Sequence, residues 1–215
     1  MQDKPFTIVI MRHGEPEGDA IFRGITDDPL TEQGWQQMHR ALASYSHFDA
    51  IFSSPLQRCA DFAQSLAHKH ALLIEKHSAL KEINFGQWEG QLIEQVAINN
   101  EQQLAQFWQD PTSFTPPDGE PVLAFQKRVL TFWDALIERM KVAQETSQKK
   151  QKYLLLTHGG VQKIILSHVL RMPISAMHNI EVPYACLSTF NVYDTTAQTI
   201  VTLQSHSAIN GACLS

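Results

Sequence analysis

Short runs of apolar residues recur along the chain and predict strands. Residues 6–11 and 153–157 are almost continuously apolar, which is typical of strands that are covered on both faces in a parallel sheet. Residues 48–53 predict a third strand, and residues 71–76 predict a weaker fourth. Near the end, residues 186–193 and 198–204 flank a polar turn, a pattern that predicts a hairpin.

Between these runs the apolar residues repeat with the period of a helix, and four helices are expected. Ser54 is expected to cap the second of them, with Pro55 in its first turn. The positions that would share one face of each helix are Trp35, Met38, Leu42 and Tyr45; Leu56, Cys59, Ala63 and Leu66; Phe125, Val129, Phe132, Leu136 and Met140; and Val161, Ile164, Ile165, His168 and Val169.

Strands that alternate with helices predict an α/β fold, namely a three-layer sandwich in which helices flank a mostly parallel central sheet. The length of 215 residues fits one domain. Residues 89–121 differ from the rest because they combine short helical stretches with a turn-rich segment. We expect them to form a small cap insertion over one end of the sheet.

Composition narrows the classes of partner. Hydrophobic residues make up 43% of the chain, enough for a substantial core, and the net charge of −5 excludes a broadly basic surface for nucleic acid. Cys59, Cys186 and Cys213 are too widely separated to suggest a disulfide framework or a zinc site. The early apolar run is too short to span a membrane and lacks the features of an export signal. We therefore expect a cytoplasmic protein without a membrane or nucleic-acid partner.

The two strongest predicted strands each end at a histidine and a glycine. Arg12-His13-Gly14 follows the first strand and His158-Gly159-Gly160 follows the other, and ligands of open α/β sheets bind at such strand ends. Arg58 falls in the opening turn of a predicted helix, where free backbone N–H groups already favour an anion. These residues predict a pocket for a phosphoryl group. Oxygen ligands for a metal are not evident there, so no metal or other cofactor is expected.

A series of short motifs spans nearly the whole chain: Arg12-His13-Gly14-Glu15, Phe22-Arg23-Gly24, Asp28-Pro29-Leu30-Thr31, Gly34, Ser53-Ser54-Pro55-Leu56-Gln57-Arg58, Leu80-Lys81-Glu82, Phe85-Gly86, Trp88-Glu89-Gly90 and Thr157-His158-Gly159-Gly160. The order of these motifs resembles the histidine phosphatase superfamily, which has the phosphoglycerate mutase-like fold. Further segments resemble the alpha-ribazole phosphatase branch: Phe107-Trp108, Asp110-Pro111, Pro116-Pro117-Asp118-Gly119-Glu120 and Phe125-Gln126-Lys127-Arg128-Val129.

This resemblance implies that His13 attacks phosphorus and forms a phosphohistidine, while Arg12, Arg58 and His158 hold the transferring oxygens. An imidazole attacks only when it is neutral, and adjacent cations lower its pKa, so the same cluster would serve both purposes. Gly159 is expected to let the backbone approach the substrate. Arg23 is a further binding candidate, although an ordinary surface arginine is the favoured interpretation.

Glu82 is the family-matched general acid, which would protonate the leaving alkoxide and later activate water. Glu15 and Glu89 are rivals, and a solvent-facing carboxylate is the favoured interpretation of Glu89. The chain departs from many family members at Pro16 and Asp19, which stand where a hydroxyl residue and an asparagine are usual. Asp19 either faces away or alters the surroundings of the site, and Gly18 permits a rearranged loop.

The leading hypothesis is a metal-independent phosphomonoesterase acting on a small phosphorylated metabolite, such as alpha-ribazole 5'-phosphate or the corresponding cobamide 5'-phosphate of cobalamin biosynthesis. Phe22, Trp88, Trp108 and Tyr184 would suit a flat ring, although a core position is favoured for Trp108. Alternatives are a broad-specificity phosphatase, a protein-directed phosphohistidine phosphatase, a phosphoglycerate mutase and a non-catalytic phosphate-binding module. Residues 89–121 contain no arginine or lysine to grip a second acidic group, which favours hydrolysis over mutase chemistry. A homodimer is left open.

Overall fold

A six-stranded sheet in the order β3-β2-β4-β1-β5-β6 forms the centre of the computed structural model, which describes residues 5–147 and 149–208. The first four strands in this order are parallel, whereas β5 is antiparallel to both β1 and β6. Cys213 lies outside the described residues. The strands are β1 (Phe6–Arg12), β2 (Ala50–Ser53), β3 (Leu73–Lys76), β4 (Lys152–Thr157), β5 (Leu187–Asp194) and β6 (Thr199–Ser207).

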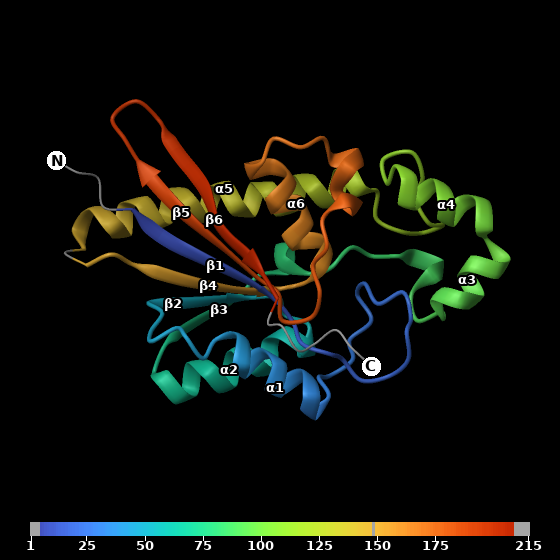
Figure 1. Cartoon of the computed structure of the whole chain (residues 1–215), viewed down its shortest axis with the longest axis horizontal. Helices are drawn as coiled ribbons and strands as arrows, with labels where there is room; N and C mark the ends of the chain where they lie inside the picture. Colours follow the sequence, from blue (N-terminus) through green and yellow to red (C-terminus); the bar gives the residue numbers. More distant parts are fainter. Residues whose placement is uncertain (1–4, 148, 209–215) are drawn as a thin grey trace.

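Helices cover both faces of this sheet (Figure 1), with α1 and α2 on one side and α5 and α6 on the other. The α-helices are α1 (Glu32–Ala41), α2 (Gln57–His70), α3 (Ile93–Asn99), α4 (Glu101–Gln109), α5 (Val122–Thr146) and α6 (Gly159–Val169). The short 3-10 helices are η1 (Ser78–Leu80), η2 (Gly86–Trp88) and η3 (Ile174–Asn179).

Strand β1 shows how the layers are held together. Its side chains alternate between the two faces, as in any strand. Ile8 and Ile10 pack into the cluster built with α5 and α6, while Val9 and Met11 pack into the cluster built with α1 and α2. All four are fully buried, which explains the unbroken apolar run. The predicted α/β sandwich with a mostly parallel sheet is confirmed.

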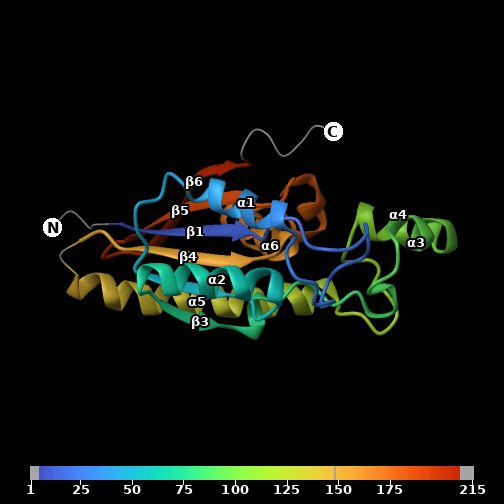
Figure 2. The same ribbon diagram turned by 90° about the horizontal axis from the view of Figure 1, so that it is seen from below.

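The segment of residues 89–121 contains α3, α4 and the turn-rich connection to α5. Figure 2 shows α3 and α4 beyond the end of the sheet toward which the arrows of β1 and β4 point. A separate apolar cluster holds this end together, and it consists of Phe22, Trp88, Val96, Leu104 and Phe107. Residues that line a space at the carboxyl ends of β1 and β4 can therefore come from both the sheet and this segment.

Two local predictions were wrong. The N-cap of α2 is Leu56 rather than Ser54, and Pro55 precedes the helix. The hydroxyl of Ser54 instead lies 2.7 Å from Nε2 of His158, a buried partner distant in sequence. Tyr45 lies beyond α1, which ends at Ala41, so it shares no helical face with Trp35.

No helix among the described residues is both long enough and apolar enough to cross a membrane.

Candidate active site

The parallel pairing of β1 with β4 brings two histidines together. Arg12 is in register with Thr157, so the residues that follow them, His13 and His158, leave the sheet side by side. Their ring centroids are 5.2 Å apart, and both side chains are buried. The predicted convergence of two distant motifs is therefore present in the fold.

The contacts of His13 define its neutral tautomer. Nδ1 lies 2.7 Å from the carbonyl oxygen of Gly14, which can only accept, so Nδ1 carries the proton. Nε2 is then unprotonated, and it accepts a hydrogen bond of 3.3 Å from Nε of Arg58. This nitrogen has the lone pair that a nucleophile needs.

His158 is arranged in the opposite sense. Its Nδ1 accepts a hydrogen bond of 3.2 Å from the same Nε of Arg58. The proton of the neutral ring is therefore on Nε2, which donates to the hydroxyl of Ser54 at 2.7 Å. One N–H of Arg58 is thus shared between the two imidazoles.

Burial lowers the pKa of His13 well below its ordinary value of 6.5, and the charges of Arg12 and Arg58 lower it further. Burial is also the largest cause of the lowered pKa of His158, followed by the charge of Arg58. Both rings are consequently neutral near pH 7, as the hydrogen bonds require.

Arg58 is fully buried at the second position of α2. Its Nη1 donates to the carbonyl of Thr26 at 2.5 Å, and its Nη2 donates to the carbonyl of Gly24 at 2.6 Å. With its outer nitrogens held by one loop, the guanidinium presents Nε to the two histidines.

Arg12 provides a second guanidinium. Nη1 donates to the carbonyl of Val182 at 2.5 Å, and the group lies 4.3 Å from the centroid of the Tyr184 ring. Nε of Arg12 is buried and has no hydrogen-bond partner within the described part of the chain. Buried donors without a partner are rare, so this N–H is suited to donate a hydrogen bond to a ligand oxygen.

Glu82 follows η1 and turns its carboxylate toward the start of α6. Oε2 accepts from the backbone N–H of Gly160 at 2.9 Å, and Oε1 accepts from that of Ile83 at 3.0 Å. A Cβ at Gly160 would lie only 2.3 Å from Oε1, so glycine is needed for this approach. Glu82 is half-buried, and these two hydrogen bonds hold its carboxylate at the start of α6.

The backbone around Glu82 is anchored by Arg128 of α5. The guanidinium donates to the carbonyls of Ala79, Lys81 and Glu82 at 2.8, 2.9 and 3.0 Å. It also forms a two-pronged pair with Glu120, at 2.7 and 2.8 Å. Glu120 and Arg128 lie in two of the segments that resemble the alpha-ribazole phosphatase branch.

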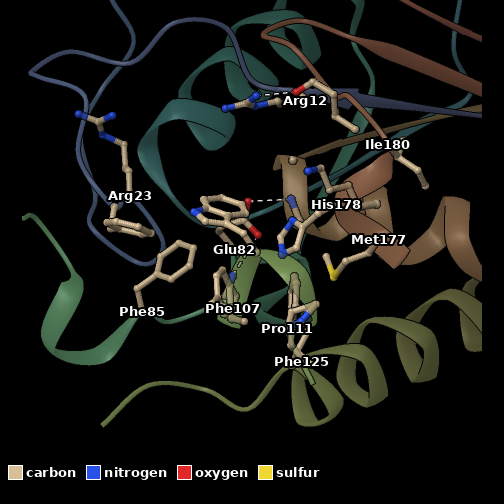
Figure 3. Close-up of a pocket in the computed structure, with 18 of the residues that line it drawn as sticks. Arg12, Arg23, Glu82, Phe85, Phe107, Pro111, Phe125, Met177, His178 and Ile180 are labelled. Carbon is tan, nitrogen blue, oxygen red and sulfur yellow. Dashed lines mark hydrogen bonds between the residues drawn. The ribbon is translucent and has the colours of Figure 1, made fainter. Parts of the chain in front are cut away.

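A cavity of about 500 Å³ opens beside the histidine pair. Figure 3 shows Glu82 near its centre, with Arg12, Arg23 and His178 around it and aromatic side chains below. His13, Arg58 and His158 are buried and are not among the lining residues, although Arg12 and Gly159, which adjoin the two histidines in sequence, line the cavity. The lining residues used below are Arg12, Arg23, Glu82, Gly159, Lys163 and the aromatic Phe22, Phe85, Phe107, Trp108 and Phe125.

The favoured interpretations of Arg23 and Glu89 as surface residues were wrong. The side chain of Arg23 is only 8% exposed, because Nε pairs with Asp28 at 2.7 Å and Nη2 donates to backbone carbonyls. Glu89 is half-buried and accepts five hydrogen bonds, four of them from residues 24–26. The third carboxylate considered, Glu15, is half-buried.

The loop that departs from the family pattern agrees with one of the two expectations stated for it, whereas the aromatic residues differ in part from theirs. Asp19 is exposed, and Gly18 adopts a left-handed φ of +86°, which favours glycine. Trp108 is 46% exposed at the cavity, so the core interpretation was wrong. Tyr184 is not among the cavity-lining residues. Its ring packs against the guanidinium of Arg12 and against His13, whose ring centroid is 5.8 Å away.

Lys163 is a cavity residue that sequence reasoning missed. It comes from α6, four residues after Gly159, and helical spacing places such residues on the same face. That spacing was the available signal. Its ammonium forms no hydrogen bond or ion pair with another described residue, and burial lowers its pKa. Residues 89–121 contribute no arginine or lysine, but Lys163 gives the cavity a cation in addition to its arginines.

Among residues 5–147 and 149–208, no group of three or more histidine, cysteine, aspartate or glutamate side chains is arranged to hold a metal ion.

Known proteins match this chain along nearly its whole length. A 2,3-bisphosphoglycerate-dependent phosphoglycerate mutase from Rhizobium etli is 30% identical over 196 residues, covering 86% of this chain and 90% of the mutase. An adenosylcobalamin/alpha-ribazole phosphatase from Escherichia coli K12 is 27% identical over 188 residues, covering 85% of this chain and 88% of that phosphatase.

Solved structures agree on the fold. The structure described as Mycobacterial hydrolase 2 superposes with a TM-score of 0.84 at 20% identity, covering 98% of this chain and 93% of the hydrolase. A putative alpha-ribazole-5'-P phosphatase from Escherichia coli superposes with a TM-score of 0.78 at 24% identity, covering 94% and 96% of the two chains. The family model of the histidine phosphatase superfamily, branch 1, matches residues 8–205. The chain therefore belongs to the histidine phosphatase superfamily.

Proposed function

We propose that this protein is a metal-independent phosphomonoesterase that acts on a small phosphorylated metabolite through a phosphohistidine at His13. The observation that carries the proposal is the pairing of an unprotonated Nε2 of His13 with the buried guanidinium of Arg58. The nucleophile and the cation that can stabilise the transferring group are thus held together. Family membership supports phosphoryl chemistry in general.

In the first step, the lone pair on Nε2 of His13 forms a bond to phosphorus while the bond between phosphorus and the alcohol oxygen breaks. Negative charge spreads over the three equatorial oxygens, and Arg12 and Arg58 are the donors proposed to hold them. His158 is proposed to join them as a donor once the bound phosphoryl dianion offsets the neighbouring arginines and Nδ1 gains a proton. The N–H of Arg58 that now faces two imidazole nitrogens would then have a phosphoryl oxygen to bind. Arg12 contributes its unpartnered Nε.

Glu82 is the proposed general acid and base. Its proton passes to the departing alcohol oxygen, leaving a carboxylate. That carboxylate then takes a proton from water as the water oxygen attacks phosphorus and the bond to His13 breaks. Inorganic phosphate leaves, and Glu82 is protonated again. The backbone N–H groups of Gly160 and Ile83 hold the carboxylate in place for both steps, and such catalysis contributes ~10²–10⁴-fold.

Alpha-ribazole 5'-phosphate, or the corresponding cobamide 5'-phosphate, is the finer proposal for the substrate. The names of two relatives support it. The cavity supports it as well, because Phe22, Phe107 and Trp108 line the space next to Glu82, and aromatic walls suit a planar ring. Arg23 and Gly159 also line the cavity and are proposed substrate contacts.

A second candidate is a phosphomonoester whose alcohol part carries an acidic group. The specific observation that favours it is the ammonium of Lys163, which faces the cavity without a partner among the described residues. Lys163 can bind a second acidic group from outside residues 89–121. The lack of arginine and lysine in that segment is therefore a weaker reason to disfavour a phosphoglycerate mutase.

A panel of phosphomonoesters tests these proposals. It should include alpha-ribazole phosphate, phosphoserine, 3-phosphoglycerate and p-nitrophenyl phosphate, assayed with and without EDTA and with identification of every product. Release of inorganic phosphate that EDTA does not reduce supports the proposal. A phosphoglycerate isomer as the main product would indicate a mutase, and phosphate binding without turnover would indicate a binding module. A cytoplasmic location and a homodimer stay predictions.

A further inference from the structure

Glu89 has an unusual set of partners for a carboxylate. Oε2 accepts from the backbone N–H of Gly24 at 3.2 Å and from the N–H and hydroxyl of Thr26 at 3.0 and 2.5 Å. Oε1 accepts from the N–H groups of Ile25 and Phe85 at 2.9 and 2.8 Å. These five donors outnumber the roughly four lone-pair sites of a carboxylate. Four of them belong to one three-residue loop, residues 24–26.

The opposite side of this loop faces Arg58. The carbonyls of Gly24 and Thr26 accept from Nη2 and Nη1 of Arg58. The peptide group between Gly24 and Ile25 therefore has its oxygen on the guanidinium and its N–H on the carboxylate of Glu89. A peptide dipole oriented in this way is favourable at both ends, because its negative end meets the cation and its positive end meets the anion.

The packing leaves this arrangement little freedom. A Cβ at Gly24 would lie 2.0 Å from the carbonyl oxygen of Ile83 and 2.1 Å from Oε1 of Glu89. Within the described chain, Arg58 forms no direct ion pair with a carboxylate, although it is fully buried. Buried charges are normally paired with an opposite charge. Here the peptide groups of residues 24–26 lie between the guanidinium of Arg58 and the carboxylate of Glu89 and bond to both.

We propose that Glu89 is a positioning residue for Arg58, acting through the peptide groups of residues 24–26 as an indirect counter-ion that aims Nε of Arg58 at His13 and His158. The inference rests on the proposed phosphatase function. It gives a role to the Trp88-Glu89-Gly90 motif, which the two chemical steps do not use. Glu89 itself does not touch the substrate in this account.

The role makes a distinctive kinetic prediction. Arg58 would stabilise charge on the phosphoryl oxygens, and that charge develops whichever alcohol leaves. Loss of Glu89 should therefore slow good and poor leaving groups alike and weaken the binding of vanadate, a phosphate mimic. A fault in Glu82 would instead affect poor leaving groups most. Because small misplacements in a site can be costly, we expect a loss of ~10- to 100-fold in kcat/KM.

The test is a double-mutant cycle of Glu89→Gln with Arg58→Lys, followed by kcat/KM for p-nitrophenyl phosphate and for an alkyl phosphate. Glutamine keeps the size of the side chain but loses the charge and one acceptor atom. We expect Glu89→Gln to cost nearly nothing once Arg58 is lysine. An equal loss in both backgrounds would show that Glu89 acts without Arg58 and would overturn the proposal.

Two further variants guard against misfolding. Thr26→Val removes only the hydroxyl donor to Glu89 and should give a smaller loss of the same, leaving-group-independent kind. Glu138→Gln removes an exposed carboxylate of α5 and serves as the control. If Arg58→Lys does not fold, the vanadate affinity of Glu89→Gln and Thr26→Val decides, and unchanged affinity in both folded variants contradicts the proposal.

Failure of the proposed function would look different. A wild-type protein that binds vanadate but hydrolyses no phosphomonoester would refute the phosphatase. The effect of Glu89→Gln on vanadate affinity could still be measured with that protein, by calorimetry. The two proposals can thus fail separately.

Discussion

The Nε of Arg58 lies 3.3 Å from Nε2 of His13, so a permanently charged guanidinium donates to the unprotonated ring nitrogen. Burial and the charge of Arg12 lower the pKa of this ring, and the contact with Arg58 lowers it further, because a proton on Nε2 would face a like charge. The same N–H reaches His158 at 3.2 Å. A buried arginine between two neutral imidazoles is the electrostatic basis of the proposed nucleophile.

The first prediction concerns stability in acid. The pKa values of His13 and His158 in the folded protein lie well below 6.5, whereas the unfolded chain has the ordinary value. The unfolded state therefore binds more protons as the pH falls below 6.5, and the free energy of unfolding decreases. Each histidine contributes up to about 1.4 kcal/mol per pH unit. Urea unfolding between about pH 7.5 and pH 5 measures the slope, and His13→Gln should make it shallower. An unchanged slope would show that folding does not lower the pKa of His13.

Glu82→Gln should slow poor leaving groups far more than p-nitrophenyl phosphate, because p-nitrophenolate leaves without a proton. The expected difference is on the order of 10²-fold in kcat/KM, which reports the transfer to His13 and not the later attack of water. Steady-state rates with an alkyl phosphate and with p-nitrophenyl phosphate provide the comparison. An equal loss of kcat/KM for both substrates would assign Glu82 to binding rather than to protonation of the leaving group.

Arg128→Lys should reproduce part of the Glu82 phenotype. Lysine cannot make the three carbonyl contacts and the two-pronged pair with Glu120 at once, so the turn that carries Glu82 would shift. We expect a leaving-group-dependent loss of roughly 10-fold. Arg139→Lys is the matched control, because Arg139 pairs with Glu75 at an exposed site. The same loss for both leaving groups would separate Arg128 from Glu82.

Lys163→Met tests the second candidate substrate class. A charged hydrogen bond to an acidic group should be lost, which raises KM for phosphoserine and 3-phosphoglycerate by roughly 10-fold or more. Alpha-ribazole phosphate and p-nitrophenyl phosphate lack that group and should be unaffected. Lys127→Met removes an exposed lysine of α5 as a control. A uniform effect on all four substrates would remove the support for an acidic alcohol.

Much of the fold was predictable because its signals are local. The buried strands β1 and β4 show as continuous apolar runs, and the residues that follow them meet because the strands are parallel and adjacent. The positions of His13, His158 and Arg58 therefore follow from strand and helix boundaries. Lys163 was also within reach, through its spacing from Gly159 on α6.

Other features depend on contacts that no local pattern contains. Ser54 precedes a predicted helix, where a serine usually acts as the N-cap. Its hydroxyl instead forms a hydrogen bond with His158, which is 104 residues away. Glutamate usually lies at the surface. Glu89 instead accepts hydrogen bonds from the backbone N–H groups of Ile25 and Thr26, which lie 64 and 63 residues earlier. In both cases a tertiary hydrogen bond outweighed the local preference.

The most direct test of the account is to find where the phosphoryl group resides during turnover. Wild-type protein quenched in base after brief incubation with a ³²P-labelled phosphomonoester should retain label that is stable in base and labile in acid, and peptide mapping should place it on His13. The His13→Gln variant should fold, bind vanadate and retain no label. Wild-type protein that turns over substrate without such an adduct, or an adduct on another residue, would contradict the proposed mechanism.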